Sequence, residues 1–122
     1  MANEKDPYGI DPKTGGAKLD FGKSATFQGA LAYFPRAIME VAKVSQYGAG
    51  KYHWKGWEKV PDGYNRYSDA MVRHICKESI EGEWDLDAKN DPKYPGDVRH
   101  AAQAAWNALA RLELILKDQE AK

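Results

Sequence analysis

The most restrictive feature of this sequence is an apolar stripe near its C-terminus. The stripe recurs at i, i+4, i+7, i+11, i+14 and i+18, and its members are Val98, Ala102, Ala105, Leu109, Leu112 and Leu116. Residues at these intervals lie along one side of an α-helix, which has about 3.6 residues per turn. The stripe therefore predicts one long amphipathic helix that ends the chain.

An earlier segment also carries a helical pattern. It begins at Pro35, whose missing N–H suits the first turn of a helix. We expect Gly48 and Gly50 to end this helix, because glycine favours the backbone conformation that follows a helix C-terminus. A shorter helix is expected just before it, near residues 26–34.

Between these two lies a further helix, expected from about Ser68 to Glu81 and ended by Gly82. Its apolar arc consists of Met71, Val72, Ile75, Cys76 and Ile80. No segment of the chain shows the alternation of a β-strand. The sequence therefore predicts an all-α protein with three main helices, a small helical bundle.

Composition indicates one small folded domain with flexible ends. The chain has 122 residues, of which 43% are hydrophobic and 30% are charged, as in ordinary globular proteins. Residues 1–24 are interpreted as an N-terminal arm, residues 25–118 as the all-α domain and residues 119–122 as a frayed tail. Three helices make a thin core, so we expect oligomerisation to complete the bundle.

Charge and hydropathy argue against two classes of partner. The chain has 18 basic and 18 acidic residues, and no helix carries a basic stripe, so we expect no nucleic-acid partner. No apolar run has the length of a membrane span, and the N-terminal residues lack the apolar core of a signal peptide. The single cysteine, Cys76, excludes an intramolecular disulfide and a cysteine-rich metal site. We expect a soluble cytoplasmic protein.

Acids and histidines gather on one face of each of the last two helices. On the first of these, the face opposite the apolar arc carries His74, Glu78 and Glu81 at i, i+4 and i+7. On the last helix, a face with alanines beside it carries Asp97, His100, Asn107 and Arg111. A solvated face usually carries Lys and Glu, so alanines beside Asp and His suggest a close neighbour.

Two interpretations of this pattern must be weighed. Taken singly, Glu78 and Glu81 are typical of a solvated helix face, Asp97 of a helix N-cap, and His100 of an ordinary histidine. Taken together, they predict a metal site with these four residues as ligands and catalytic groups. Oxygen-rich ligands suit Mg²⁺ or Mn²⁺, and a bound cation relieves the repulsion between gathered carboxylates.

Aromatic and basic residues interleave between the first and second main helices. The aromatic ones are Tyr47, Tyr52, Trp54, Trp57 and Tyr64, and the basic ones are Lys51, Lys55 and Lys59. Aromatic rings stack on nucleobases and lysines bind phosphates, so this loop is a candidate nucleotide contact. Equally, Trp54 and Trp57 would cover the end of a small helical core, and both interpretations can hold.

A series of short motifs appears in a familiar order. They are "GAKLDFGK" at 16–23, "EVAKVSQYGAGKY" at 40–52, a tryptophan at 54 or 57, "RH" at 73–74, "GE" at 82–83 and "RHAAQAAWNAL" at 99–109. This series resembles the phage-associated dATP/dGTP diphosphohydrolase family, also called MazZ-like, over about residues 16–117. The resemblance implies the fold of the MazG-like all-α NTP pyrophosphohydrolases.

That superfamily carries E-x-x-E on one helix and E-x-x-D on another. Glu78 and Glu81 match the first half, whereas Asp97 and His100 replace the Glu and Asp of the second. His100 would therefore bind metal, contact phosphate or orient a water. Rival ligands are Glu83 and Asp85, which lie just beyond Gly82, and Glu40 on the first main helix.

The resemblance also implies an activity, namely metal-dependent hydrolysis of a purine deoxynucleoside triphosphate, dGTP or dATP, to monophosphate and pyrophosphate. Lys51 and Arg73 would hold phosphates, Trp54 or Trp57 would stack on the base, and Asn107 would bind base or sugar, with His74 facing the same site. Members form homodimers or homotetramers, and the phage relatives place the reaction in phage nucleotide metabolism, in the host cytoplasm.

The replacements at Asp97 and His100 leave one alternative open, a non-catalytic nucleotide-binding or sensor module on the same scaffold. An HD-type phosphohydrolase is disfavoured, because the chain contains no His-Asp dipeptide.

Overall fold

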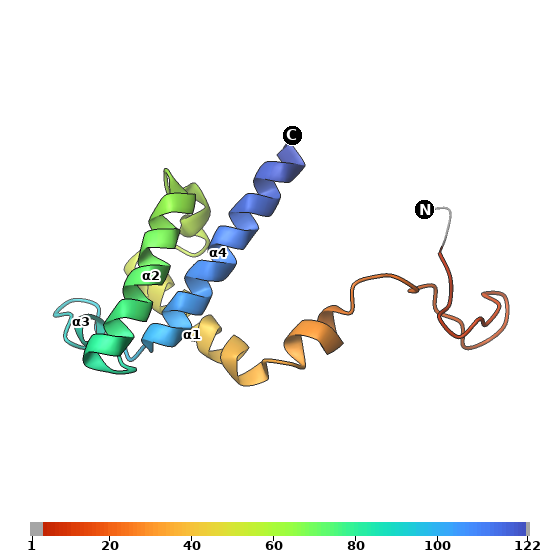
Figure 1. The fold of residues 1–122 in the computed structure, drawn as a ribbon, viewed down its shortest axis with the longest axis horizontal. Helices are drawn as coiled ribbons and strands as arrows, with labels where there is room; N and C mark the ends of the chain where they lie inside the picture. The colour runs from red at the N-terminus through yellow and green to blue at the C-terminus, as the bar shows by residue number, and fades with distance from the viewer. Residues whose placement is uncertain (1–3, 122) are drawn as a thin grey trace. The chain divides into compact units, whose positions relative to one another are not determined.

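The computed structural model describes residues 4–121 of the chain (Figure 1). Its elements, in chain order, are η1 (Phe27–Leu31), α1 (Pro35–Lys51), η2 (Gly56–Lys59), α2 (Gly63–Glu81), α3 (Leu86–Lys89) and α4 (His100–Ala121). No β-strand occurs in the described part of the chain, which confirms the all-α prediction. Within residues 4–121, no helix has both the length and the apolar character needed to cross a membrane.

The chain divides into two compact units, Met1–Phe34 and Pro35–Lys122. The division falls at the start of α1, ten residues beyond the arm boundary at residue 24 that composition suggested. At the other end, α4 continues to Ala121, so residues 119–121 extend the last helix. Lys122 lies outside the described residues.

In the first unit, the side chain of Asp6 holds several turns together. Asp6 accepts hydrogen bonds from the backbone N–H groups of Tyr8, at 2.7 Å, and Lys18, at 2.8 Å. The bond from Lys18 contributes most to holding the pKa of Asp6 below its ordinary value. The short helix expected near residues 26–34 is present as η1, a single π-helical turn.

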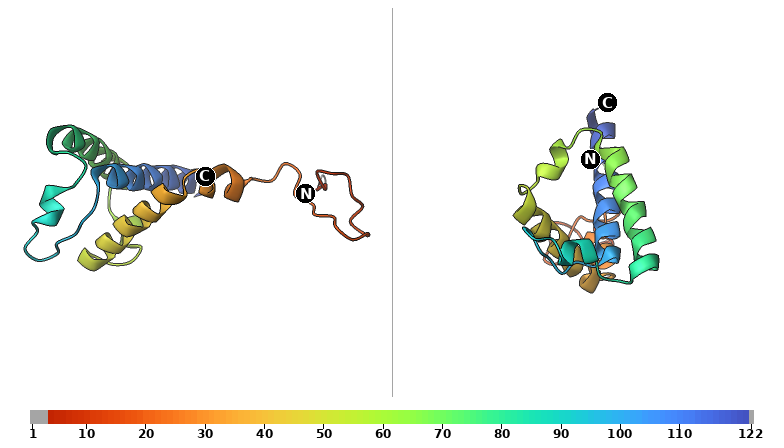
Figure 2. Two further views of the ribbon diagram at one scale, coloured as in Figure 1. Left: turned by 90° about the horizontal axis from the view of Figure 1, so that it is seen from below. Right: turned by 90° about the vertical axis from the view of Figure 1, so that its left-hand side faces the viewer.

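In the second unit, α2 and α4 lie side by side, and α1 packs against α4 (Figures 1 and 2). The face of α4 that is buried here is mostly polar or alanine, and consists of His100, Ala102, Gln103, Asn107 and Ala110. Each of its polar side chains takes part in a hydrogen bond, which offsets the cost of burial. Contacts between the two helices include the His74–His100 hydrogen bond and an edge-to-face pair of Tyr67 with Trp106.

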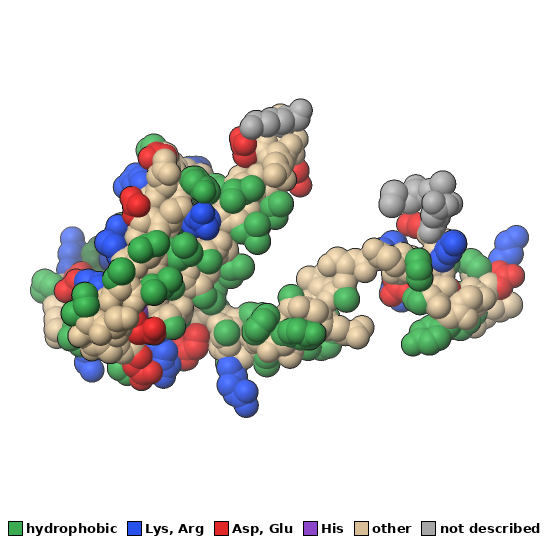
Figure 3. Space-filling view, in the orientation of Figure 1, with side chains coloured by type: hydrophobic (Ala, Val, Ile, Leu, Met, Phe, Trp, Pro, Cys, Tyr) green, Lys and Arg blue, Asp and Glu red, His purple; other side chains and the backbone are tan. Residues whose placement is uncertain are grey.

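Many of the large apolar side chains of both helices are exposed instead. Leu109 on α4 is 55% exposed and Ile80 on α2 is 81% exposed, and Val72, Ile75, Leu112 and Leu116 are exposed with them. Figure 3 shows hydrophobic side chains spread over the visible surface of α2 and α4. The apolar pattern of the sequence located both helices. Most of the apolar stripe of α4, however, is exposed to solvent in the single chain.

The ends of the helices show where local signals succeed and fail. Gly82 ends α2 with a φ of 99°, a conformation that favours glycine, as expected. In contrast, α1 runs through Gly48 and Gly50 to Lys51, because each glycine weakens a helix by only about 1 kcal/mol. The α4 helix begins at His100, so Asp97 precedes it and is not in its first turn.

Candidate functional site

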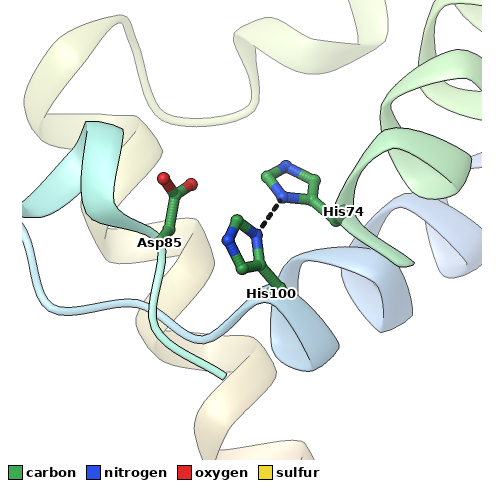
Figure 4. A group of neighbouring side chains, drawn as sticks. All are labelled: His74, Asp85 and His100. Atoms are coloured by element: carbon green, nitrogen blue, oxygen red, sulfur yellow. Dashed lines mark hydrogen bonds between the residues drawn. The ribbon is translucent and has the colours of Figure 1, made fainter. Parts of the chain in front are cut away.

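Three side chains from three different elements meet near the start of α4 (Figure 4). They are His74 from α2, Asp85 from the N-terminus of α3 and His100, the first residue of α4, and one donor atom of each lies within 4.8 Å of the others. The Nδ1 atoms of the two histidines are 2.9 Å apart. We call these three residues the His-Asp-His group, and their donor atoms are close enough together to hold a metal ion.

Backbone hydrogen bonds fix two members of this group next to each other. The N–H of Asp85 donates to the carbonyl of Val98 at 3.0 Å, and the N–H of His100 donates to the carbonyl of Glu83 at 2.8 Å. These bonds flank an isolated antiparallel bridge between Trp84 and Arg99. The segments before α3 and before α4 are thus paired next to Asp85 and His100, the residues that they contribute to the group.

Arg99 accounts for two of the rival ligands that the sequence suggested. Its guanidinium lies 4.4 Å from the centre of the Trp84 ring, and it pairs with Glu40 at 3.8 Å and with Glu83 at 4.0 Å. The carboxylates of Glu40 and Glu83 therefore face this arginine. Asp85, the third rival, belongs to the His-Asp-His group.

Glu81 sets the orientation of His100. Its Oε2 atom lies 3.0 Å from Nε2 of His100 and also accepts the backbone N–H of Leu86 at 2.8 Å. These two hydrogen bonds, chiefly that from Leu86, hold the pKa of Glu81 below its ordinary value, so the carboxylate is ionised at neutral pH. An ionised carboxylate only accepts, so Nε2 of His100 carries the proton that faces Glu81, and Nδ1 is the ring nitrogen that faces His74.

Asp85 is buried, with only 7% of its surface exposed, and hydrogen bonds hold its carboxylate in place. Its Oδ1 accepts the N–H of Ala88 at 3.1 Å, as the N-cap of α3, and its Oδ2 accepts Nε2–H of Gln103 at 2.9 Å. Burial raises the pKa of Asp85, but the hydrogen bonds from Gln103 and Ala88 and the nearby histidines bring it below its ordinary value. The side chain is an oriented carboxylate.

His74 completes the group as a half-buried imidazole. Burial is the main cause that lowers its pKa below 6.5, and the Asp85 carboxylate only partly opposes this. The neutral form, which metals require of histidine, is therefore favoured near pH 7.

Of the four predicted metal ligands, the structure brings together Glu81 and His100. Glu78 and Asp97 are exposed, and among the described residues neither side chain makes a hydrogen bond or ion pair with the His-Asp-His group. Glu78 shares a helix face with His74 and Glu81, but it lies on the exposed part of that face.

Beside this group lies a cleft of about 1320 Å³. Its walls come from α1, α2, α4 and the segment between α1 and α2, and they are rich in aromatic and basic side chains. Five of the predicted nucleotide contacts line it, namely Lys51, Trp54, Trp57, Arg73 and Asn107. Further basic residues in its walls are Lys55 and Arg66.

The two tryptophans of the cleft have different environments. Trp57 packs edge-to-face against Tyr67 and Trp106, with ring centres 6.1 and 5.9 Å away, and its carbonyl accepts the Tyr67 hydroxyl at 2.7 Å. Trp54 is 61% exposed. The core-covering interpretation therefore fits Trp57, whereas Trp54 offers a free ring face.

Gln103 links the cleft to the His-Asp-His group. Its side chain lines the cleft and donates to Asp85 at 2.9 Å. Its backbone carbonyl accepts Nδ2–H of Asn107 at 2.7 Å. Sequence reasoning missed this residue, although it stands at i+3 from His100 and i−4 from Asn107 and therefore shares their face.

Residues 15–122 match the sequence model of a protein family described as dATP/dGTP diphosphohydrolase, N-terminal. The chain belongs to this family. The match covers every residue of the His-Asp-His group and of the cleft, and it agrees with the resemblance seen in the motifs. Neither the curated proteins nor the solved structures contain a significant match.

Proposed function

We propose that this protein hydrolyses a purine deoxynucleoside triphosphate, dGTP or dATP, to the monophosphate and pyrophosphate with a divalent cation, Mg²⁺ or Mn²⁺. Membership of the dATP/dGTP diphosphohydrolase family supports the substrate class. The observation that carries the proposal is the aromatic and basic cleft, which Gln103 connects to the His-Asp-His group. Such a cleft suits a triphosphate at one end and a base at the other.

The lining residues suggest how a nucleotide binds. Lys51 and Arg73 hold the phosphates, and Gln103, which lines the same cleft, bonds to Asp85, so that the phosphates approach the His-Asp-His group. Trp54 stacks on the base. Asn107 donates a side-chain N–H to the backbone carbonyl of Gln103, and its side-chain oxygen accepts a hydrogen bond from the base or sugar.

The reaction replaces one phosphorus–oxygen bond with another. Water attacks the α-phosphorus, the bond to the β-phosphate bridging oxygen breaks, and Lys51 and Arg73 stabilise the departing pyrophosphate. A divalent cation, when bound, neutralises charge on the triphosphate and makes bound water more acidic. The proton released by water passes to a nearby carboxylate, for which Glu78, Glu81, Asp85 and Asp97 are the candidates.

The exposed apolar faces of α2 and α4 support assembly into a homodimer or homotetramer. Single chains rarely leave contiguous apolar surface uncovered, and Ile80, Leu109 and Leu112 are all exposed. We further propose that the protein is a MazG-like pyrophosphohydrolase of phage nucleotide metabolism. Glu78 and Asp97 remain predicted site residues within that assignment.

The product of the reaction tests this proposal. Purified protein is incubated with dGTP or dATP and Mg²⁺ or Mn²⁺, and pyrophosphate and orthophosphate are measured separately. Stoichiometric pyrophosphate with the monophosphate supports the proposal, whereas orthophosphate as the first product contradicts it. Metal-independent dGTP binding without turnover would instead favour a nucleotide-binding or sensor module.

A further inference from the structure

We infer that the His-Asp-His group binds one transition-metal ion in preference to Mg²⁺, through Nδ1 of His74, Nδ1 of His100 and a carboxylate oxygen of Asp85. Candidate ions are Mn²⁺, Fe²⁺, Co²⁺ and Zn²⁺. The group would be the cation site of the proposed hydrolase. Only the role of the metal in catalysis rests on that proposed function, whereas metal binding itself does not. Glu81 is assigned a different role from that of ligand, as the partner that orients His100.

The spacing of the two histidine nitrogens matches that of neighbouring metal ligands. Two ligands at right angles around a metal, each about 2.1 Å from it, are about 3.0 Å apart. The Nδ1 atoms of His74 and His100 lie 2.9 Å apart, which is the spacing of two neighbouring ligands. One carboxylate oxygen of Asp85 and one ring nitrogen of each histidine all lie within 4.8 Å of one another.

The orientation of His100 also favours a metal site. Nε2–H of His100 donates to the Glu81 carboxylate at 3.0 Å, and Nδ1 is the ring nitrogen that faces His74, at 2.9 Å. Metal-binding histidines usually donate their other N–H to a carboxylate or carbonyl in this way. His100 is 0% exposed, so burial and Glu81 together hold its ring in one orientation. A bound metal ion would take the place of the hydrogen bond that joins the two Nδ1 atoms.

The donor atoms of the His-Asp-His group also favour particular metals. Two imidazole nitrogens and one carboxylate suit Mn²⁺, Fe²⁺, Co²⁺ or Zn²⁺, whereas Mg²⁺ prefers oxygen ligands and water. Three protein ligands leave coordination positions open, which water or phosphate oxygens can fill. Gln103 lies between Asp85 and the cleft, so these positions are next to the place proposed for the triphosphate.

The competing explanation is a hydrogen-bonded chain from Glu81 through His100 to His74 that serves only to hold α2 against α4. The two explanations differ in a simple observable, because a structural chain binds no metal. They also differ in the role of Asp85, which is not a member of that chain.

Metal binding to the full-length protein, stripped with a chelator, tests the inference without any nucleotide. Co²⁺ is added and its visible absorption is recorded, and Mn²⁺ binding is measured by electron paramagnetic resonance with excess Mg²⁺ present. We expect one ion per chain, retained in excess Mg²⁺. The Asp85→Asn and His74→Gln variants, checked for folding by circular dichroism, are expected to bind at least about 100-fold more weakly.

Two further variants make the assignment specific. Glu81→Gln should weaken binding by about 10- to 100-fold, as expected for loss of an orienting carboxylate rather than of a ligand. Asp87→Asn is the matched control, because Asp87 is an exposed carboxylate two positions from Asp85 that pairs with Lys77. The inference is overturned if no ion binds, if Asp85→Asn and His74→Gln bind normally, or if only Glu78→Gln and Asp97→Asn lose the metal.

The outcomes separate this inference from the proposed hydrolysis. Binding of Co²⁺ that depends on Asp85, in a protein that does not hydrolyse dGTP or dATP, supports the inference and removes the proposed function. Full pyrophosphate release with Mg²⁺ by a His74→Gln variant that no longer binds Co²⁺ removes this site as the cation site of the hydrolase.

Discussion

The Nδ1 atoms of His74 and His100 lie 2.9 Å apart, although the two residues are separated by 26 positions in the chain. This contact joins the middle of α2 to the first residue of α4. It sits beside the carboxylates of Asp85 and Glu81, and Gln103 connects it to an aromatic and basic cleft. Each consequence of this arrangement can be tested separately.

The two tryptophans of the cleft should respond differently to substitution. Trp54→Ala should weaken dGTP binding by about 1–3 kcal/mol through lost stacking, with little change in melting temperature. Trp57→Ala should lower the free energy of unfolding by about 2 kcal/mol, because Trp57 packs on Tyr67 and Trp106 and is only half-buried. Calorimetry with dGTP and thermal unfolding measure the two effects. Equal loss of stability in both variants would show that Trp54 is also a packing residue.

Binding of the triphosphate should depend on the basic side chains of the cleft. Lys51→Ala and Arg73→Ala should each raise the KM for dGTP by about 10-fold or more, since a hydrogen bond to a charged group contributes about 1.5–3 kcal/mol. Lys43→Ala is the matched control, because Lys43 lies on the same helix as Lys51 but outside the cleft and pairs with Glu40. Equal effects of Lys43→Ala and Lys51→Ala on KM would exclude a specific phosphate contact.

How far the sequence could predict this site depends on which signal each residue carries. The apolar period located α2 and α4 and placed His74, Glu78 and Glu81 on one face. It could not tell which part of that face α4 covers, because residues at i, i+4 and i+7 lie within an arc of only about 60° and the pattern marks no boundary inside it. In the structure, His74 and Glu81 are partly buried and Glu78 is exposed.

Asp85 was harder to predict because it lies outside a long helix. Its position is set by the N-terminus of α3, which is only four residues long, and by the backbone pairing with Val98. The N-cap signal of an Asp before "LDAK" was present in the sequence, but one turn of helix gives no periodicity. The pairing between the loops is non-local and leaves no pattern in a single sequence.

Stability should depend on pH through His74. Burial holds its pKa below the ordinary value of 6.5, so as pH falls the unfolded chain takes up this proton before the folded protein does. The contribution of His74 is therefore complete above about pH 6.5 and is lost as pH falls through its folded-state pKa. Glu81 and Asp85 also have lowered pKa values, so their contributions are lost only below their ordinary values of 4.5 and 3.8.

Thermal unfolding in the presence of a chelator, from about pH 7.5 to pH 3, measures this dependence. The wild-type melting temperature should begin to fall below about pH 6.5, and His74→Gln should remove that first decrease while keeping the steeper one in acid. His53→Gln, at an exposed histidine, should behave as wild type. An unchanged first decrease in His74→Gln would assign it to another group.

Assembly should depend on the exposed face of α4. Leu112→Glu places a charge on that face and should shift the protein from dimer or tetramer to monomer in light-scattering measurements after gel filtration. Gln46→Glu adds the same charge at an exposed position on α1 and should leave the assembly intact. A wild-type protein that is monomeric at micromolar concentration would contradict the proposed oligomer.

The most direct test of the account is pyrophosphate release from dGTP by chelator-treated protein, with and without added Mn²⁺, in wild type and in Asp85→Asn. We predict that the treated wild-type protein is inactive, that Mn²⁺ restores stoichiometric pyrophosphate and dGMP, and that Asp85→Asn loses at least about 100-fold in rate at the same Mn²⁺ concentration. Full activity after metal removal, or wild-type activity of a folded Asp85→Asn protein, would contradict a metal-dependent hydrolase centred on the His-Asp-His group.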